Sequence, residues 1–265
     1  MPSDRHTVTR APPLTVLYRD DMLIAIDKPG GLLVHRSLID RHETRFAIQL
    51  LRDQIGQRVY PLHRLDKPTS GVLLFALSED AARRMGRLFE GNAVRKTYLA
   101  VVRGYTDAQA RIDYPLREEH DRMTDALADA GKPAQPAITD YRRLATLELP
   151  VSDGRHPTSR YSLLAVTPHT GRKHQIRRHM KHIFHPVIGD TTHGDGRHNR
   201  LFREYLHCSR LLLTAFELRF THPDTGAVIV IRAPLDAEFA RIAAAFGWDG
   251  ELETPKESGG LRSIP

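Results

Sequence analysis

A single carboxylate stands among cations in residues 63–71, HRLDKPTSG, where Asp66 lies between Arg64 and Lys67. An Asp before a Pro-Thr-Ser-Gly stretch commonly accepts the hydrogen bonds of a turn. Here the apolar run at 72–77 follows directly, which favours a partly desolvated acid that the neighbouring cations keep ionised. Such a carboxylate is a competent nucleophile, so the segment has both a structural and a catalytic interpretation.

A second cluster of cations occupies residues 171–182, GRKHQIRRHMKH. Ile176 and Met180 recur at helical spacing and are expected to face the core. No acid occurs between residues 171 and 188, so the cations form either a solvated helix face or, given their density, a surface that binds an anion. They are Arg172, Lys173, Arg177, Arg178 and Lys181.

Histidines are frequent in the same region, which raises the hypothesis of a metal site. Their spacing matches no H-E-x-x-H or comparable ligand pattern, and no acid interleaves until Asp190. The chain also contains no G-x-G-x-x-G, Walker loop or G-x-S-x-G, so we expect no metal, cofactor or serine nucleophile. The histidines concerned are His174, His179, His182, His185 and His193.

The composition favours a polyanionic partner and a reducing compartment. The 265 residues include 39 Lys and Arg, 32 Asp and Glu and 15 His, with a formal net charge of +7. Such a balance is typical of proteins that bind nucleic acid. The alternative interpretation is that it only confers solubility. Cys208 is alone, which excludes an intrachain disulfide framework and a zinc site built on paired cysteines. With no signal-peptide core and no long apolar run, we expect a cytoplasmic protein without membrane contact.

The periodicity predicts one α+β domain built around a large, mainly antiparallel sheet. We expect a loose leader at 1–13, the folded domain at 14–250, a loose tail at 251–265 and a charged surface excursion at 104–136. Strands are expected within 15–35, 72–77, 96–104, 137–149, 160–168, 206–220 and 228–234, and helices within 43–56, 79–92, 171–183 and 236–248.

Three segments in this order, HRLDKPTSG, RKTYLAVVRG and TGRKHQIRRH, resemble the signatures of the RluA-type pseudouridine synthases. The opening DDMLIAIDKPGGLLVH and the later HPVIGDTTHG are also similar to that family, so the resemblance spans nearly the whole expected domain. It implies the pseudouridine synthase catalytic fold, a large mixed and mainly antiparallel sheet with flanking helices and a central basic cleft. It also implies isomerisation of uridine to pseudouridine in RNA, without cofactor or metal.

The resemblance assigns roles to particular residues. It makes Asp66 the catalytic nucleophile and Arg177 its partner, so Arg177 is expected to point into the cleft. Tyr98, otherwise read as a strand aromatic, is implied to lie against the target base and is a candidate for the proton transfer at C5. Arg64 is implied to fill the space that a flipped base leaves. The expected phosphate contacts are Lys96, Arg172, Lys173 and Arg178.

Finer details indicate the target. HRSLIDRHETRFAIQLLRDQIGQ and AAFGWDG resemble the branch of the family that acts on uridine 65 of tRNA. We expect no S4 RNA-binding domain, so substrate selection would come from the catalytic domain itself, including the excursion at 104–136. The alternatives are a ribosomal RNA target, a non-catalytic RNA-binding module and a His-rich metal-dependent hydrolase. No obligatory protein partner is evident.

Overall fold

The computed structural model describes residues 12–36, 43–118, 133–252 and 262–264. The leader expected at 1–13 lies almost entirely outside these ranges, as do most of the expected tail and the middle of the expected excursion. In the part of the chain that is described, no helix is long and apolar enough to cross a membrane.

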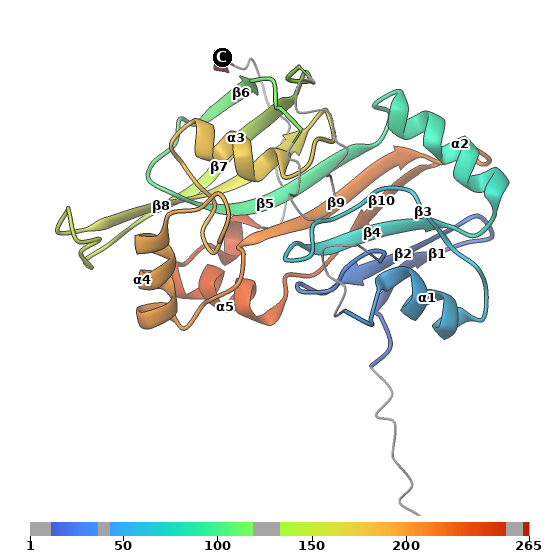
Figure 1. Cartoon of the computed structure of the whole chain (residues 1–265), viewed down its shortest axis with the longest axis horizontal. Helices are drawn as coiled ribbons and strands as arrows, with labels where there is room; N and C mark the ends of the chain where they lie inside the picture. The colour runs from blue at the N-terminus through green and yellow to red at the C-terminus, as the bar shows by residue number, and fades with distance from the viewer. Residues whose placement is uncertain (1–11, 37–42, 119–132, 253–261, 265) are drawn as a thin grey trace, which may run out of the picture.

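Eleven strands form one mixed sheet in the order β1-β2-β4-β9-β5-β8-β7-β6-β11, with β3 paired to β4 and β10 to β9 (Figure 1). The pairs β4–β9 and β6–β11 are parallel, and the other pairs are antiparallel. This confirms the expected mixed, mainly antiparallel sheet. The strands are β1 (Val16–Arg19), β2 (Leu23–Lys28), β3 (Tyr60–Pro61), β4 (Ser70–Ala76), β5 (Arg95–Arg103), β6 (Gln109–Asp113), β7 (Ile138–Leu149), β8 (Ser159–Pro168), β9 (Leu213–Thr221), β10 (Val228–Arg232) and β11 (Arg262–Ile264).

Five α-helices flank the sheet, and local sequence signals set several of their ends. The Ser78 side chain accepts a hydrogen bond from the backbone N–H of Ala81 at the start of α2, as an N-cap does. Gly56 adopts the left-handed conformation that ends α1. The helices are α1 (Ala47–Ile55), α2 (Glu79–Glu90), α3 (Gln175–His182), α4 (Gly196–Leu206) and α5 (Ala237–Ala245), with a short 3-10 turn η1 (Asp249–Glu251).

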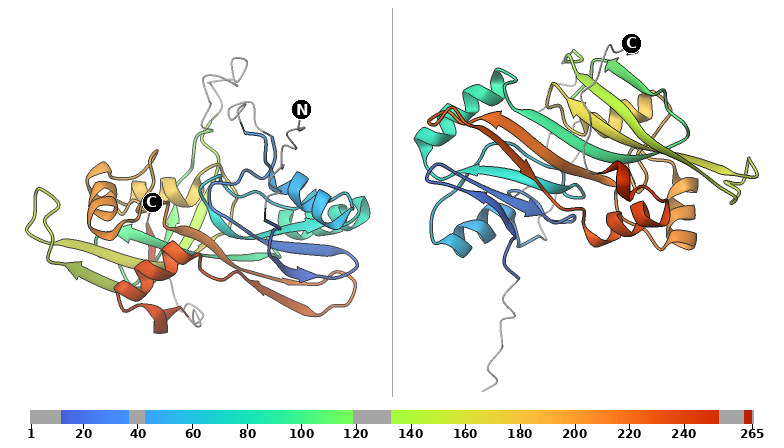
Figure 2. Two further views of the ribbon diagram at one scale, coloured as in Figure 1. Left: turned by 90° about the horizontal axis from the view of Figure 1, so that it is seen from below. Right: turned by 180° about the vertical axis from the view of Figure 1, so that it is seen from behind.

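Helices lie on both faces of the twisted sheet (Figure 2), and this explains its continuous apolar strands. All seven residues of β4 are buried. Leu73 belongs to the core cluster that includes α1 residues, whereas Leu74 belongs to the cluster that contains Met85 of α2. A strand covered on both sides needs apolar residues at every position instead of alternate ones. The run at 72–77 therefore forms the buried strand that it predicts.

Two elements correct the expectations from the sequence. The segment 104–136 is not wholly a surface excursion, because β6 lies within it and buries Ala110 and Ile112. Helix α4 was not expected at all, since its sequence is rich in polar residues and opens on Gly196. In addition, the last described residues pair in parallel with β6 as β11.

Gly71 allows the close approach of β4 to β9 immediately after the segment that contains Asp66. Its φ is +108°, and a Cβ built there would lie 2.2 Å from the carbonyl oxygen of Ala215. No side chain fits that space without moving the backbone of β9. We predict that Gly71→Ala lowers the free energy of unfolding by about 3 kcal/mol, because backbone strain and overlap add.

The matched control is Gly31→Ala. Gly31 has a similar φ of +86° but no atom within 4 Å of an added Cβ, so only the left-handed strain of about 1 kcal/mol applies. Urea unfolding of both variants measures the difference, and equal losses would show that the contact with β9 does not matter.

Candidate active site

A cleft of about 680 Å³ opens where the turn before β4, strand β5 and the start of α3 meet. It is lined by every site residue that the sequence predicted, although their chemical roles stay predictions. The described ends of the 104–136 segment also line it, through Leu116, Arg117 and Gln135. The residues predicted from sequence are Arg64, Asp66, Lys96, Tyr98, Arg172, Lys173, Arg177 and Arg178.

Asp66 and Arg177 form an ion pair in this cleft. Nη1 of Arg177 lies 3.2 Å from Oδ2 of Asp66, and the side chains are 5% and 20% exposed. Arg177 shares the buried side of α3 with Ile176 and Met180, so it points inward and does not belong to a solvated stripe. The surrounding protein removes most of the water from both side chains, and the guanidinium faces the carboxylate directly.

Asp190 holds Arg177 in place from the other side. Its two oxygens accept hydrogen bonds from Nε and Nη2 of Arg177 at 2.7 and 2.8 Å, and its side chain is fully buried. Burial alone would raise the pKa of Asp190, but the hydrogen bonds from Arg177 and the backbone of His193 hold it below its ordinary value. This bidentate geometry fixes the plane of the guanidinium. The remaining nitrogen is thereby directed at Asp66.

Sequence reasoning did not assign a role to Asp190. The available signal was its position as the first acid after a long run of cations, within the HPVIGD segment. A buried Arg needs a partner that is also buried. The first acid after the run of cations is therefore a candidate for that partner.

Lys28 is a second functional residue that the sequence did not reveal. It is fully buried, and its Nζ donates to the carbonyls of Pro29, Leu32 and Lys67. Burial lowers its pKa to about 7, against the opposing influence of Asp66. Because Lys67 follows Asp66 in the chain, Lys28 ties the turn after β2 to the segment that holds the carboxylate.

Tyr98 lies on β5 with its ring partly exposed to the cleft. Burial raises its pKa well above the ordinary value, and the charge on Asp66 raises it further. Tyr98 is therefore a neutral phenol at physiological pH. It accepts a proton only if it passes its own proton to a neighbouring base.

Two histidines meet beside Asp66. His174 has a left-handed backbone conformation with φ of 54° at the start of α3. Its Nδ1 lies 3.0 Å from Nε2 of His193, and its Nε2 lies 4.0 Å from Oδ2 of Asp66. The other histidines of the cluster diverge; His179, for example, bonds the hydroxyl of Thr139 and the carbonyl of Tyr114. Among the described residues, no group of three ligand-type side chains is placed to hold a metal ion.

The outer wall of the cleft combines a neutral histidine with partly desolvated cations. The Nε2 of His63 accepts a hydrogen bond from the backbone N–H of Leu74, and its ring stacks on Phe89. Burial, together with the charge on Lys96, lowers the pKa of His63 to about 4. Burial also lowers the pKa of Lys96. Arg64, in contrast, is exposed.

Comparison with known proteins identifies the family. Residues 22–182 match the model of the RNA pseudouridylate synthase family. The chain belongs to this family. It is 54% identical over 239 residues to tRNA pseudouridine synthase C of Vibrio cholerae, covering 90% of this chain and 98% of that protein. The corresponding protein of Haemophilus influenzae is 52% identical, with 89% and 99% covered.

Solved structures agree on the fold. Human RNA pseudouridylate synthase domain containing 4 superimposes with a TM-score of 0.67 at 23% identity, covering 88% of this chain and 93% of that one. The pseudouridylate synthase fold expected from the sequence is thus confirmed, together with the expected basic cleft.

In this pseudouridylate synthase, Arg177 pairs with both Asp66 and Asp190. We therefore predict that removal of Arg177 lowers both stability and activity. In Arg177→Ala, two carboxylates that lie mostly out of water lose their cation. Breaking a buried pair from one side costs about 3–5 kcal/mol. We therefore expect a much lower Tm at pH 7 and no detectable isomerisation.

The neighbouring Arg178→Ala is the control, because Arg178 is only partly buried and its loss leaves Asp66 and Asp190 paired. Thermal unfolding and single-turnover assays on both variants test the prediction. A normal Tm for Arg177→Ala would show that the ion pairs are energetically unimportant.

The low pKa of His63 predicts a dependence of stability on pH. The folded protein keeps this imidazole neutral down to about pH 4, whereas in the unfolded chain it takes up a proton near pH 6.5. Between these values the unfolded state binds more protons, so stability falls as the pH decreases. His63→Gln retains an acceptor for the N–H of Leu74 but cannot titrate. Urea unfolding at pH 7, 6, 5 and 4 is expected to show a shallower loss in this variant, and parallel curves would contradict the assignment.

Proposed function

We propose that this isomerase converts uridine to pseudouridine in tRNA, at position 65, with Asp66 as its catalytic nucleophile. The observation that carries the proposal is the carboxylate of Asp66, which pairs with an Arg177 that Asp190 holds in place, inside a cleft lined by many cations. The choice of tRNA rests on the relatives that are more than half identical over about nine-tenths of the chain and are named tRNA pseudouridine synthase C. Position 65 rests on the resemblance found in the sequence.

The reaction is a balanced rearrangement. The bond from C1′ to N1 of uridine breaks, the uracil turns, and C5 bonds to C1′; C5 then loses its proton and N1 gains one. Asp66 has three routes to assist, namely attack on C1′, addition to C6, or support of elimination across the ribose. In each route the carboxylate acts as a nucleophile or a base, and the contact with Arg177 positions it.

The target nucleotide must leave its stack to reach Asp66. Arg64 is exposed at the mouth of the cleft, where a planar guanidinium can occupy the space that the base leaves. The proposed phosphate contacts are Lys96, Arg172, Lys173 and Arg178, which position the RNA without reading its sequence. A cytoplasmic location, where tRNA is found, is part of the same proposal.

Tyr98 is proposed to lie against the flipped base and to relay the proton from C5. Because its phenol is neutral, it must release its own proton as it accepts another. Asp66 is close enough for its charge to raise the pKa of Tyr98, so this carboxylate is the acceptor that we propose. Asp66 becomes a carboxylate again only after it releases this proton to solvent or to N1.

A non-catalytic RNA-binding module is disfavoured by the same geometry. Binding to phosphates is weakened by any fixed anion nearby, yet this cleft pairs Asp66 with a buried Arg that a second, buried acid holds in place. Maintaining three mostly buried charges is useful for chemistry and has no benefit for a surface that only holds RNA.

Tritium release from C5-labelled, unmodified tRNA transcripts tests the reaction and the target together. We expect release by the wild type, none by Asp66→Asn, and none when cytosine replaces uridine 65. The affinity of Asp66→Asn for tRNA is expected to equal or slightly exceed that of the wild type, because the substitution leaves every cation of the cleft in place and removes one anion.

Release that persists in Asp66→Asn would refute the assignment of the nucleophile. Release that does not depend on uridine 65 would show that the target is another uridine of tRNA. Release only from ribosomal RNA fragments would show that ribosomal RNA, and not tRNA, is the substrate.

A further inference from the structure

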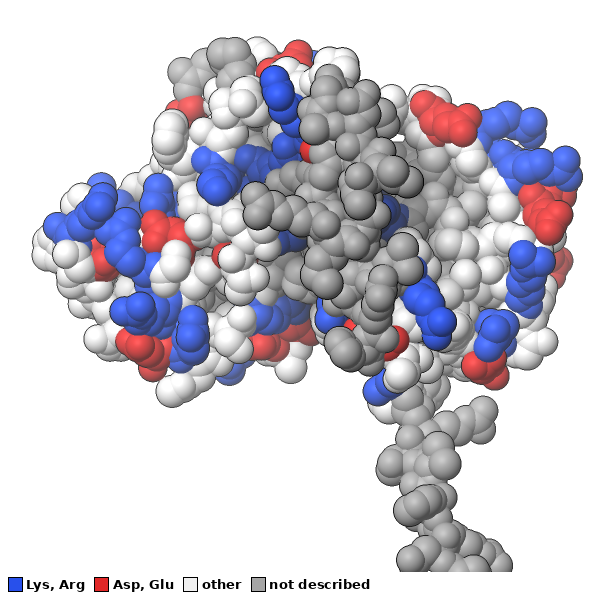
Figure 3. Space-filling model, viewed as in Figure 1, with Lys and Arg blue, Asp and Glu red and all other residues white. Residues whose placement is uncertain are grey.

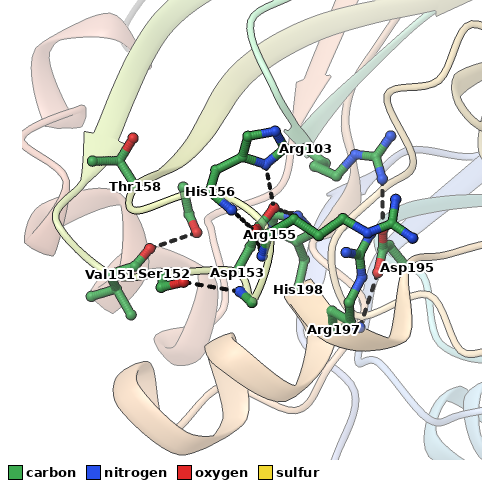
Figure 4. A network of polar contacts seen from close by, with 12 residues as sticks. Arg103, Val151, Ser152, Asp153, Arg155, His156, Thr158, Asp195, Arg197 and His198 are labelled. Carbon is green, nitrogen blue, oxygen red and sulfur yellow. Dashed lines mark hydrogen bonds and ion pairs between the residues drawn. The ribbon is translucent and has the colours of Figure 1, made fainter.

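A second basic region lies at the end of the β7–β8 hairpin, where the loop at 150–158 folds against the start of α4 (Figure 4). Asp153 organises this loop. Its carboxylate accepts hydrogen bonds from the backbone N–H groups of Arg155 and His156 at 2.7 and 2.8 Å, and it lies 3.5 Å from Nε2 of the buried His198. His198 is in turn hydrogen-bonded to the hydroxyl of Tyr161 in the core. The loop is therefore anchored to α4 and to β8.

Asp195 organises the start of α4 in the same way. It caps the helix by accepting from the backbone N–H of Arg197, and its Oδ2 lies 2.6 Å from Nη1 of Arg103 and 3.4 Å from Nη2 of Arg197. One carboxylate thus serves two guanidinium groups. In Figure 4 the side chain of Arg155 extends from the loop toward the same position, which leaves an excess of positive charge there.

The excess continues along the helix. Arg197, Arg200 and Arg203 are all exposed and recur every three residues on α4, a spacing that brings successive side chains close together. Within the described ranges, no acid pairs with Arg155, Arg200 or Arg203. We call these four residues, Arg155, Arg197, Arg200 and Arg203, the arginine surface.

The arginine surface is continuous in the chain with the wall of the active site. Asp190 binds Arg177 and His193 binds His174, and α4 begins only three residues after His193. Arg197 and Arg203 are six residues apart on α4, a distance of about 9 Å along the helix axis. Figure 3 shows Lys and Arg gathered over this end of the molecule and beside its centre, on one face.

We propose that the arginine surface binds the sugar-phosphate backbone of the substrate RNA at a distance from the target nucleotide. This inference rests on the proposed function. A structured RNA is much larger than a cleft of about 680 Å³, so its backbone must continue over the neighbouring protein surface. Arginines held on an anchored loop and helix match phosphates well, because a planar guanidinium binds two phosphate oxygens at once. An acidic protein is a less suitable partner, because the arginine surface directly follows residues 190–193, which contact Arg177 and His174 of the cleft where the RNA is proposed to bind.

The test uses the triple variant Arg155→Gln, Arg200→Gln and Arg203→Gln, with the exposed Arg83→Gln of α2 as the control. We expect the triple variant to bind full-length tRNA transcript on the order of tenfold more weakly and to show a salt slope reduced by about two to three. Its KM for tRNA is expected to rise while kcat and Tm remain those of the wild type. A short hairpin that contains only the target stem is expected to be bound and converted equally well by both proteins.

Each outcome decides the inference. An unchanged salt slope with tRNA would overturn it and would leave the arginines to another partner. Equal losses on the hairpin and on the full tRNA would also overturn it, because the arginines would then act at the cleft. Binding is measured apart from turnover, so a wild type that binds tRNA without isomerising it would end the proposed function, while the salt slope would still decide this inference.

Discussion

The site depends on one buried cation that is shared by two carboxylates. Arg177 gives two nitrogens to Asp190 and a third to Asp66, and these residues come from α3, from the loop before α4 and from the turn before β4. A single guanidinium lies between the two carboxylates, so each carboxylate faces nitrogen instead of the other acid. The ion pairs thus connect the three segments at the site.

The central strands help to determine where the charged residues Asp66, Arg177 and Asp190 lie. β4 is parallel to β9 at Ser70 and Gly71, and that contact is tight enough to exclude a side chain at Gly71. Lys28 closes the other side by binding the carbonyl of Lys67. Asp66 thus directly precedes a short segment, residues 67–71, that is held at both ends. This anchoring positions the carboxylate together with its hydrogen bond from Arg177.

Most of the sheet could be predicted from the sequence, because each strand has either alternating or continuous apolar residues and each turn has Gly, Pro or Asp. The helix α4 could not, since only Leu201, Phe202 and His198 are buried among polar neighbours and its end relies on His207 in a left-handed conformation. The short strand β6 was hidden in the same way among charged residues. The local sequence pattern does not predict an element whose stability comes from tertiary contacts.

The sequence predicted some residues of the site and missed others, for a similar reason. Family resemblance located Asp66, Tyr98 and Arg177, because those positions belong to contiguous segments. Asp190 and Lys28 act through contacts between distant segments, and a lysine before Pro-Gly-Gly looks like an ordinary exposed turn residue. Its burial follows from three carbonyl oxygens that converge on one point. Such convergence is a property of the fold and not of any short stretch of residues.

The cleft must attract a polyanion and yet keep an anion at its base, and depth resolves this conflict. Arg64 and Arg172 are exposed, whereas the Asp66 side chain is only 20% exposed and has a cation behind it. In the proposed function, phosphates meet the outer arginines first, and Asp66 repels them from the base of the cleft. Uracil carries no charge, so a flipped base enters without electrostatic cost from Asp66. The proposal thus makes base flipping a requirement of the electrostatics as well as of the geometry.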